Sequence, residues 1–215
     1  MIVFHNKFIV FEGLDGSGKT TQVKRLAKNL ADQGEDVLIS RDPGGTPTAE
    51  AIRSILKGDI CPENEKTQAL LFTAARIDNL ENVILPHLRR GGTVIMDRFL
   101  ASTLSMQGYA SRILKKPGKP DPIIFAKKMT DLITDRPSIT FLLDIDPETS
   151  QKRIALRTER TPEKPDTFEK KSALYHQEIQ RAMRDECNDL TKHLYRLDGT
   201  EDPETISKKI LSLLL

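Results

Sequence analysis

The fold is decided by one stretch of sequence: Val10-Phe11-Glu12-Gly13-Leu14-Asp15-Gly16-Ser17-Gly18-Lys19-Thr20-Thr21. From Gly13 to Thr20 it fits the pattern G-x-x-x-x-G-K-[ST], which is typical of loops that bind nucleotide phosphates. Residues 7–11 form a short apolar run that suits a buried parallel strand. Residues 20–31 place their apolar side chains on one helical face. The stretch therefore joins a strand to a helix, and a helix N-terminus is where backbone N–H groups can hold an anion.

The residue types of this loop suit phosphate binding. Its glycines allow backbone angles that are closed to other residues, so successive N–H groups can turn toward an anion. Lys19 adds a mobile positive charge for the outer phosphates, and the hydroxyl of Thr20 is a hard oxygen ligand for Mg²⁺. The alternative is an ordinary glycine-rich turn with a surface lysine, but the flanking strand and helix favour a phosphate loop. The predicted nucleotide-binding residues are Gly13, Leu14, Asp15, Gly16, Ser17, Gly18, Lys19 and Thr20.

Composition indicates one globular domain over residues 1–215, because 38% of the chain is hydrophobic and no second domain is needed. The 33 basic and 31 acidic residues are interspersed and give a net charge of +2, so we expect no nucleic-acid or membrane partner. Cys61 and Cys187 lack metal-ligand spacing and predict free thiols in a reducing compartment. The first apolar run is broken by polar residues and leads into the phosphate loop, and no long apolar span follows. We therefore expect a cytoplasmic protein.

Strands and helices alternate along the chain. Further strands are expected at residues 36–40, 93–97, 138–144 and 193–197. Helices are expected at residues 48–57, 64–90, 122–134, from 147 onward, at 168–189 and at 204–214, with Pro86 as a possible interruption of the second. No element is assigned to residues 102–118, and the charged, turn-rich segment 157–171 should be mobile and solvated. The predicted fold class is α/β, with a five-stranded parallel sheet covered by helices on both faces in three layers.

Three polar clusters follow predicted strands, at residues 12–19, 42–46 and 97–98. Ligands of open parallel sheets bind at the carboxyl ends of the strands, so these clusters should converge. Asp97 ends a buried strand, where a carboxylate can receive Mg²⁺ or a metal-bound water beside a phosphate loop. The sequence therefore predicts a metal site formed by Thr20 and Asp97.

A phosphate loop alone is compatible with GTPases, ATPases, small-molecule kinases and regulatory modules. The Asn-Lys-x-Asp guanine-binding motif of GTPases is absent, although Asp42-Pro43-Gly44-Gly45 matches a switch loop formally. A kinase for a phosphorylated acceptor needs a second anion site that faces the first. Arg53, Arg76 and Arg98 are candidates for that site.

With these motifs together, the chain resembles the thymidylate kinase family. The resemblance lies in residues 12–21, the turn Arg41-Asp42-Pro43-Gly44-Gly45-Thr46, Phe72-x-x-x-Arg76, Asp97-Arg98-Phe99, Ser102-Thr103 and Gln107-Gly108. It covers nearly the whole chain in the right order. It implies the P-loop kinase fold with a lid segment, and transfer of the γ-phosphoryl group of ATP to dTMP with Mg²⁺. The rival functions are a deoxynucleoside kinase, which takes an unphosphorylated acceptor, and a regulatory nucleotide-binding module.

The resemblance also implies the residues that hold the base. Phe72 would stack on thymine, Arg76 would donate to a base carbonyl, and Thr103 and Gln107 would complete the polar contacts to the pyrimidine edge. An aromatic face and a guanidinium fork suit a planar polar base. The residues alone leave alternatives open, because Phe72 could belong to the core and Arg76 could be a solvated helix residue.

On the sugar and phosphate side, the resemblance implies that Asp15 binds the 3′-hydroxyl of the deoxyribose. Arg53 and Arg98 would grip the acceptor phosphate, and Asp97 would organise the Mg²⁺ and its water. Alternatively, Arg53 could pair with Glu50 on the surface and Asp97 could cap the next helix.

Two positions depart from the family pattern. Asp42 stands where the family usually has Glu, and Met106 stands where it commonly has Tyr. If that Tyr closes the sugar site against a 2′-hydroxyl, Met106 would do so only by its bulk, which puts discrimination between deoxyribose and ribose in doubt.

Some members of the family that the chain resembles supply a catalytic arginine from the phosphate loop, but here the residue after Asp15 is Gly16, so an arginine for the transition state must come from another segment. The segment 157–166 is predicted to act as a lid that brings Arg157, and secondarily Arg160, to the transferring phosphate. The alternative is a solvated loop in which these arginines pair with Glu159 and Glu163. Family members that lack the loop arginine favour catalytic roles for Arg157 and Arg160 beside Lys19 and Asp97. The resemblance also implies a homodimer in which residues 64–90 share the interface.

Overall fold

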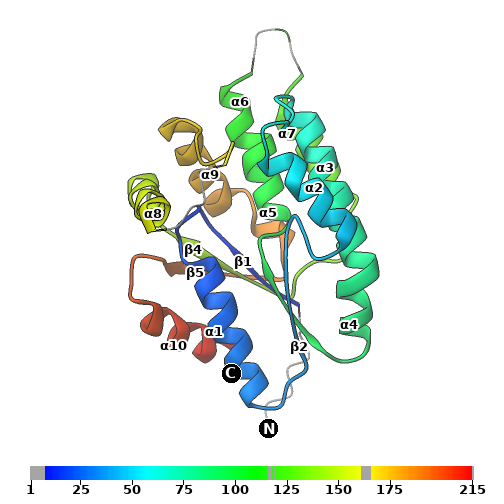
Figure 1. Cartoon of the computed structure of the whole chain (residues 1–215), viewed down its shortest axis with the longest axis vertical. Coiled ribbons are helices and arrows are strands. Elements are labelled where there is room, and N and C mark those ends of the chain that lie inside the picture. Colours follow the sequence, from blue (N-terminus) through cyan, green and yellow to red (C-terminus); the bar gives the residue numbers. More distant parts are fainter. Residues whose placement is uncertain (1–7, 116–117, 119, 161–165, 215) are drawn as a thin grey trace.

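The computed structural model describes residues 8–115, 118, 120–160 and 166–214. Its centre is a five-stranded sheet in the order β2-β3-β1-β4-β5, in which every pairing is parallel (Figure 1). The strands are β1 (Phe8–Glu12), β2 (Val37–Arg41), β3 (Thr93–Asp97), β4 (Ile139–Asp144) and β5 (His193–Asp198). The predicted five-stranded parallel sheet of an α/β fold is confirmed.

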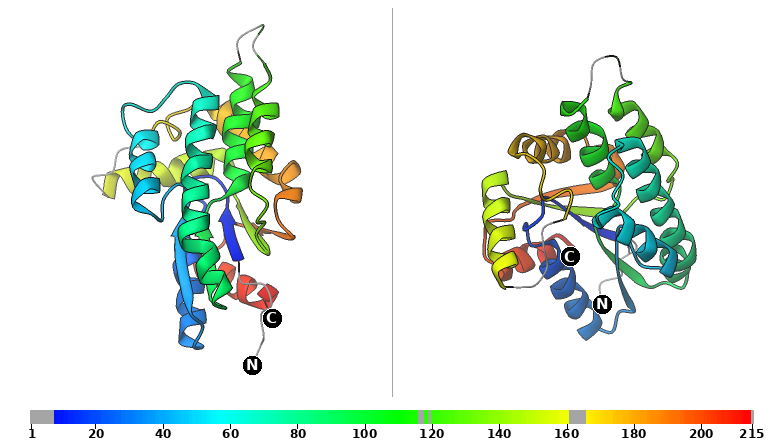
Figure 2. Two further views of the ribbon diagram at one scale, coloured as in Figure 1. Left: turned by 90° about the vertical axis from the view of Figure 1, so that its right-hand side faces the viewer. Right: turned by 45° about the horizontal axis from the view of Figure 1, so that its top comes forward.

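One face of the sheet is covered by α1 (Lys19–Asp32) and α10 (Pro203–Leu214), which lie side by side (Figures 1 and 2). Val23, Leu26 and Leu30 of α1 pack with Ile206 and Ile210 of α10 against the strands. These residues recur every three or four positions, so each helix presents one apolar stripe to the sheet. The phosphate loop is therefore fixed at both ends, by a buried strand and by a packed helix.

The opposite face is covered by a larger group of helices. They are α3 (Glu65–Asn79), α4 (Leu85–Arg89), α5 (Leu100–Thr103), α7 (Pro122–Asp131) and α9 (Ala173–Asp185), while α2 (Pro47–Lys57) packs against α3 (Figure 2). Residues 65–89 form one continuous helical segment, as the periodicity predicts, with a wide π turn η1 (Leu80–Ile84) just before Pro86. The short 3₁₀ turn η3 (Asn188–Leu190) precedes β5.

The register of the sheet brings the predicted polar clusters to one level. Asp97 is the register partner of Phe11 in β1 and of Arg41 in β2. The residues that follow β1 and β2 therefore emerge beside Asp97 and Arg98. This alignment confirms that the three polar clusters meet at the carboxyl edge of the sheet.

A buried helical segment occupies part of the region to which the sequence analysis assigned no element. After α5 comes the π-helical segment η2 (Leu104–Ala110) and then α6 (Ser111–Ile113). Gly108 lies in η2, where an added Cβ would approach the Cβ of Ala126 to 3.1 Å. Gly108 therefore permits close packing against α7, which local sequence patterns do not reveal.

The expectation that residues 157–171 form a solvated excursion is wrong at both ends. Arg157 to Arg160 are the last turn of α8 (Pro147–Arg160), and Phe168 and Glu169 are buried. The expected helix 168–189 accordingly begins only at Ala173, where Ser172 caps it, and ends at Asp185. The many charged residues of this segment suggested a solvated loop, although several of them also favour helices, and α8 continues to Arg160. The rest of the predicted lid, residues 161–165 with Pro162, Glu163 and Pro165, lies outside the described residues.

Within the described residues, no helix combines the length and apolarity that crossing a membrane requires.

The turn between β2 and α2 depends on Gly45, and this dependence is testable. Gly45 has φ of +95°, and an added Cβ would lie 2.5 Å from Asn79 Oδ1 and 2.6 Å from Ser40 Oγ. We predict that Gly45→Ala lowers the free energy of unfolding by about 3 kcal/mol, from backbone strain and steric overlap together. Gly34→Ala is the matched control, because Gly34 also has positive φ (+87°) but open space around its Cβ position. It should cost only about 1 kcal/mol, and equal losses in urea unfolding would contradict the packing argument.

Candidate active site

The phosphate loop is shaped by close backbone contacts. Gly13 has φ of +141°, and a Cβ there would lie 2.4 Å from the carbonyl oxygen of Leu143 and 2.8 Å from Ser17 Oγ. Lys19 is buried and donates from Nζ to the carbonyl oxygens of Leu14 (2.8 Å) and Gly13 (3.1 Å). Burial, reinforced by the charge of Arg98 and opposed by nearby carboxylates, lowers the pKa of Lys19 to about 8. A phosphate would supply the negative charge that this ammonium group needs.

Thr20 and Asp97 lie together as predicted. The Thr20 hydroxyl donates to Asp97 Oδ2 at 2.6 Å, although the two residues are far apart in sequence. A hydroxyl and a carboxylate are both hard oxygen donors, so the pair fits Mg²⁺. Among the described residues no group of three or more His, Cys, Asp or Glu side chains is placed to hold a metal ion. Such a sparse donor set suits Mg²⁺, which usually keeps several waters and binds substrate phosphates.

Arg98 links the phosphate loop to the turn after β3. Its Nη2 donates to Asp15 Oδ1 at 2.6 Å, and its Nη1 donates to Ser102 Oγ at 2.9 Å. Burial alone would raise the pKa of Asp15, but the charges of Arg98 and Lys19 hold it well below its usual range. Arg98 has φ of 71°, a left-handed conformation that is unfavourable outside glycine and is often found at functional sites.

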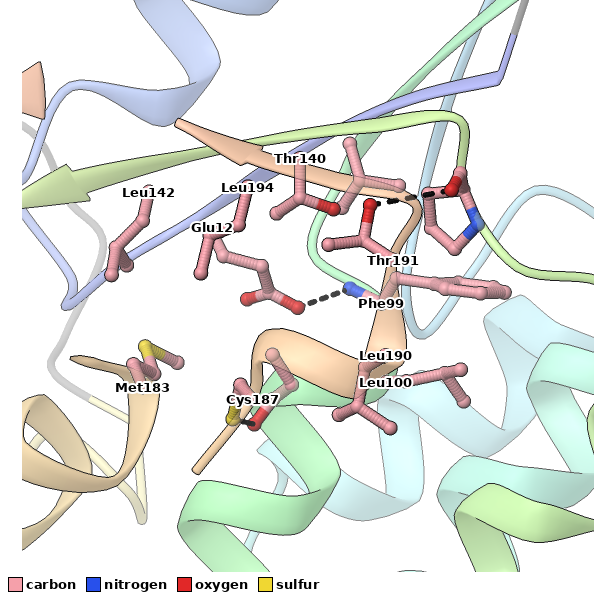
Figure 3. Close-up of a pocket in the computed structure, with 13 residues that line it drawn as sticks. Glu12, Phe99, Leu100, Thr140, Leu142, Met183, Cys187, Leu190, Thr191 and Leu194 are labelled. Carbon is pink, nitrogen blue, oxygen red and sulfur yellow. Dashed lines mark hydrogen bonds between the residues drawn. The ribbon is translucent and has the colours of Figure 1, made fainter. Parts of the chain in front are cut away.

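Glu12 fixes this turn, and the sequence analysis assigned it no role. Its Oε1 accepts from the backbone N–H of Phe99 (2.8 Å) and of Ser102 (3.1 Å), and its Oε2 accepts from Ser102 Oγ (2.7 Å). The first contact is drawn in Figure 3. The carboxylate thus satisfies N–H groups at the start of α5 that have no partner within the helix. In the sequence, the position of Glu12 at the end of a predicted strand was the feature that could have indicated this role.

The pocket in Figure 3 lies behind this turn and not at the phosphate loop. Glu12 is its acidic residue, and the remaining lining is mostly apolar side chains of β1, β4, α5 and the segment 183–194. The labelled apolar residues are Phe99, Leu100, Leu142, Met183, Leu190 and Leu194. Because the candidate arginines are not part of its lining, we do not assign this pocket to the acceptor phosphate.

Arg76 is buried, with 2% of its surface exposed, so the solvated alternative is wrong. Its Nε donates to Asp42 Oδ2 (2.5 Å), and its Nη2 donates to Thr103 Oγ1 (2.8 Å) and to the carbonyl oxygen of Phe99 (3.2 Å). Nη1 has no hydrogen-bond partner among the described residues. Burial raises the pKa of Asp42 to about 6, although the charge of Arg76 opposes the change. The structure therefore brings Arg76 and Thr103 together as predicted.

Phe72 lies one helical turn before Arg76 and is 9% exposed. Its ring packs at 5.9 Å from that of Phe168, and both belong to an apolar cluster with Met106. Gln107 is also buried, and its Oε1 has no hydrogen-bond partner among the described residues. A buried polar atom without a partner costs free energy, so a ligand that supplied one would be favoured.

Arg53 is partly buried, and its Nη1 donates to the carbonyl oxygen of Pro43 at 2.8 Å. The Glu50 carboxylate instead accepts hydrogen bonds from Arg41 (2.8 and 3.1 Å) and from the backbone N–H of Gly45 (3.1 Å). In the described part of the chain Glu50 thus pairs with Arg41, and not with Arg53 as the alternative interpretation proposed. Arg53 lies beside the turn that precedes α2.

Helix α8 packs directly on the phosphate loop, which the sequence analysis did not foresee. Ser150 Oγ donates to the carbonyl oxygen of Asp15 (2.7 Å), and Arg153 Nη1 donates to those of Gly16 (3.1 Å) and Gly199 (2.8 Å). A Cβ on Gly16 would approach the Cβ of Arg153 to 3.1 Å. A side chain at position 16 would therefore require α8 to move by a few tenths of an ångström, in addition to the strain of the positive φ (+76°) at this position. No local sequence pattern indicates these contacts.

Of the two predicted lid arginines, Arg157 pairs with a residue that the sequence analysis did not name. Its Nη2 donates to Glu169 Oε1 at 2.6 Å, and Glu169 Oε2 accepts from the backbone N–H of Asp166 at 3.1 Å. Arg160 is exposed at the end of α8. Figure 1 shows α8 beside the carboxyl edge of the sheet, away from α3. The structure therefore joins Arg157 to the turn 166–169.

Comparisons with known proteins agree with this geometry. Residues 11–210 match the family model described as thymidylate kinase. The chain is 40% identical to a thymidylate kinase of Bartonella henselae, over 94% of this chain and 92% of that protein. It is 37% identical to one of Ruegeria pomeroyi, over 97% of this chain and 94% of that protein. A crystal structure of thymidylate kinase from Ehrlichia chaffeensis superposes with a TM-score of 0.71 at 27% identity, covering 96% of this chain and 97% of that one. The resemblance read from the motifs is thus confirmed, and the chain belongs to the thymidylate kinase family.

Proposed function

We propose that this chain transfers the γ-phosphoryl group of ATP to dTMP, giving dTDP and ADP, as a step toward dTTP. The choice of acceptor rests on a buried donor and a buried acceptor that have no hydrogen-bond partner in the part of the chain that the structure describes. Arg76 Nη1 is the donor and Gln107 Oε1 is the acceptor. Arg76 lies on α3 one turn after Phe72, whose flat ring suits a planar base, and Gln107 lies in η2, which contacts α3.

This pair matches the edge of thymine. Thymine has a carbonyl acceptor at position 4 and an N–H donor at position 3, whereas cytosine has an amino donor at position 4 and an acceptor at position 3. Arg76 Nη1 would donate to the carbonyl and Gln107 Oε1 would accept from the N–H. Cytosine would leave both buried groups unpaired, and unpaired buried groups produce strong selectivity. Thr103 supports this arrangement by accepting from Arg76.

The acceptor phosphate would be held by Arg98 and Arg53. Arg98 is fixed by Asp15 and Ser102, and Arg53 is placed by its contact with Pro43. Arginine forks match phosphate oxygens and remain charged at all relevant pH values. Asp15, which already accepts from Arg98, would also accept from the 3′-hydroxyl of the sugar. The acceptor would thus lie between α3 and the phosphate loop.

Charge at the transferring phosphate would come from Lys19 and from Mg²⁺ at Thr20 and Asp97. When bound, Mg²⁺ would neutralise charge on the nucleotide phosphates. Lys19 would exchange its contacts with the loop carbonyls for contacts with phosphate oxygens. Arg157, with Arg160 second, would add charge only after leaving Glu169 during closure of the lid at about residues 157–166.

We also propose a homodimer in which the segment 65–89 shares the interface, and a cytosolic location. Leu70 on α3 is 52% exposed, which supports an uncovered apolar position there. Two cysteines without a disulfide are in keeping with a reducing compartment. Light scattering tests the dimer, because a monomer at assay concentration would exclude it.

The assignment is tested by a coupled assay with ATP, Mg²⁺ and a panel of acceptors. We predict rapid multiple turnover with dTMP, slower turnover with dUMP and little with dCMP or thymidine. Preference for thymidine would instead identify a deoxynucleoside kinase, and absence of multiple turnover with every small acceptor would favour a regulatory module. Removal of Mg²⁺ with a chelator should abolish turnover.

Arg157 provides a test of the lid. We predict that Arg157→Ala lowers kcat about 10²-fold and changes KM for dTMP only a few-fold, because the contact forms mainly in the transition state. Lys152→Ala on the exposed side of the same helix is the control, since it removes a cation whose partner is Glu148 on that helix. Near-normal kcat in Arg157→Ala would leave Lys19 and Mg²⁺ as the main charges.

Asp42 should make dTMP binding depend on pH. With its pKa at about 6, Asp42 is ionised at pH 7.5 and becomes protonated as the pH falls to 5. Protonation weakens its hydrogen bond with Arg76, so KM for dTMP should rise as the pH falls. The phosphate of dTMP also titrates in this range, so the measurement compares the wild type with Asp42→Asn. We predict a smaller rise of KM in Asp42→Asn, and parallel pH profiles would exclude this role.

A further inference from the structure

Two polar contacts join α3 to the helical segment that follows β3. Gln68, Phe72 and Arg76 lie four residues apart and therefore share one face of α3. Arg76 donates to Thr103 at 2.8 Å, and Gln107 Nε2 donates to Gln68 Oε1 at 3.5 Å. The two contacts flank Phe72 along the helix. The first involves predicted site residues only, whereas Gln68 has no role in the proposed function so far.

A chain of hydrogen bonds determines how the two amides are oriented. The carbonyl oxygen of Pro62 can only accept, and it takes a hydrogen bond from Gln68 Nε2 at 2.6 Å. The other end of this amide, Gln68 Oε1, must therefore face Gln107. Because Gln68 Oε1 can only accept, it selects the NH₂ group of Gln107 as its partner. Gln107 Oε1 then remains as the buried acceptor.

Burial makes this orientation matter. Gln68 is 5% exposed and Gln107 is 1% exposed. Bulk water therefore cannot replace the hydrogen bonds that an inverted amide would lose. The two ends of a glutamine amide have nearly the same shape, so packing alone cannot distinguish them. Only hydrogen bonding can distinguish the two orientations of the Gln107 amide, and among the described residues Gln68 is the partner that selects one of them.

We propose that Gln68 is a positioning residue that fixes the amide of Gln107 with its oxygen toward the base, and thereby favours pyrimidines that carry a hydrogen at N3. This inference rests on the proposed function, since it assumes that Gln107 faces the base of the acceptor nucleotide. Thymine offers N3–H to the fixed oxygen. A cytosine-type base offers an N3 lone pair, which the inverted amide could bind but the native amide cannot.

The test compares dTMP with 5-methyl-dCMP, which keeps the methyl group and reverses donor and acceptor at positions 3 and 4. The measured quantity is the ratio of kcat/KM for the two nucleotides. Gln68→Met keeps the length of the side chain and removes the acceptor, so the amide of Gln107 can invert. We expect the ratio to fall about tenfold, with most of the change in KM. Gln68→Ser, which removes the acceptor with less bulk, should show the same loss and serves if Gln68→Met does not fold.

Two controls separate positioning from general destabilisation. Gln68→Glu keeps an acceptor toward Gln107, and its protonated form, which burial favours, can still donate to the carbonyl oxygen of Pro62, so the ratio should stay within about threefold of the wild type. Thr73→Val removes a different buried hydrogen bond of α3, from Thr73 Oγ1 to the carbonyl oxygen of Ala69 (2.7 Å), and should leave the ratio unchanged.

The outcomes distinguish this inference from the function on which it rests. If the wild type prefers dTMP but Gln68→Met or Gln68→Ser lowers kcat/KM equally for both nucleotides, Gln68 only supports the packing and the proposal is wrong. If the wild type does not phosphorylate dTMP, the proposed function itself has failed.

Discussion

The candidate site depends on the hydrogen bonds between the buried carboxylate of Glu12 and the turn after β3. It stands at the end of β1, directly before the phosphate loop, yet its partners belong to the turn after β3. A buried charge is tolerated only when its hydrogen bonds are satisfied, and here two N–H groups and one hydroxyl satisfy it. The start of α5 gains partners that the helix cannot provide itself. One residue thus joins the strand that leads into the phosphate loop to the turn that carries Arg98.

Arg98 shows why this junction matters. It has an unfavourable backbone conformation, and its side chain is held by Asp15 in the phosphate loop and by Ser102, which in turn donates to Glu12. The negative charges of Asp15, Glu12 and Asp97 overcome burial and raise the pKa of Arg98. The guanidinium is therefore fixed before any ligand arrives. Such preorganisation lowers the entropy that is lost when an acceptor phosphate is oriented for transfer.

The elements that could be predicted from sequence are those with local signals. The phosphate loop, the parallel sheet and the meeting of Thr20 with Asp97 follow from a motif, from apolar runs and from the rule that strand ends converge. The segment 157–171 was misjudged because charged residues and prolines usually indicate a solvated loop, and residues 102–118 were assigned no element, whereas in both places distant packing decides the structure.

Most of the contacts in the candidate site that sequence reasoning missed join residues far apart in the chain. Ser150 and Arg153 of α8 bind the loop backbone, and Gln68 binds Gln107. Each is an ordinary residue for its helix, so its type carries no signal until the fold brings the partner near. Asp42 differs, because the family pattern marked it as a departure. Its role as the partner of Arg76 became visible only with the side chains in place.

The claim that Glu12 holds Arg98 for the acceptor phosphate can be measured directly by binding. In the wild type, Ser102 Oγ donates to Glu12 Oε2 and accepts from Arg98. In Glu12→Gln the amide would donate to Ser102 Oγ instead of accepting from it. The variant would also lose a negative charge near Arg98. Calorimetric titration should compare dTMP with thymidine, which lacks the phosphate, for the wild type and for Glu12→Gln. The account predicts that the preference for dTMP over thymidine falls about tenfold in Glu12→Gln, because Arg98 holds the phosphate less firmly. An unchanged preference, with both affinities equal to the wild type or reduced by the same factor, would contradict it.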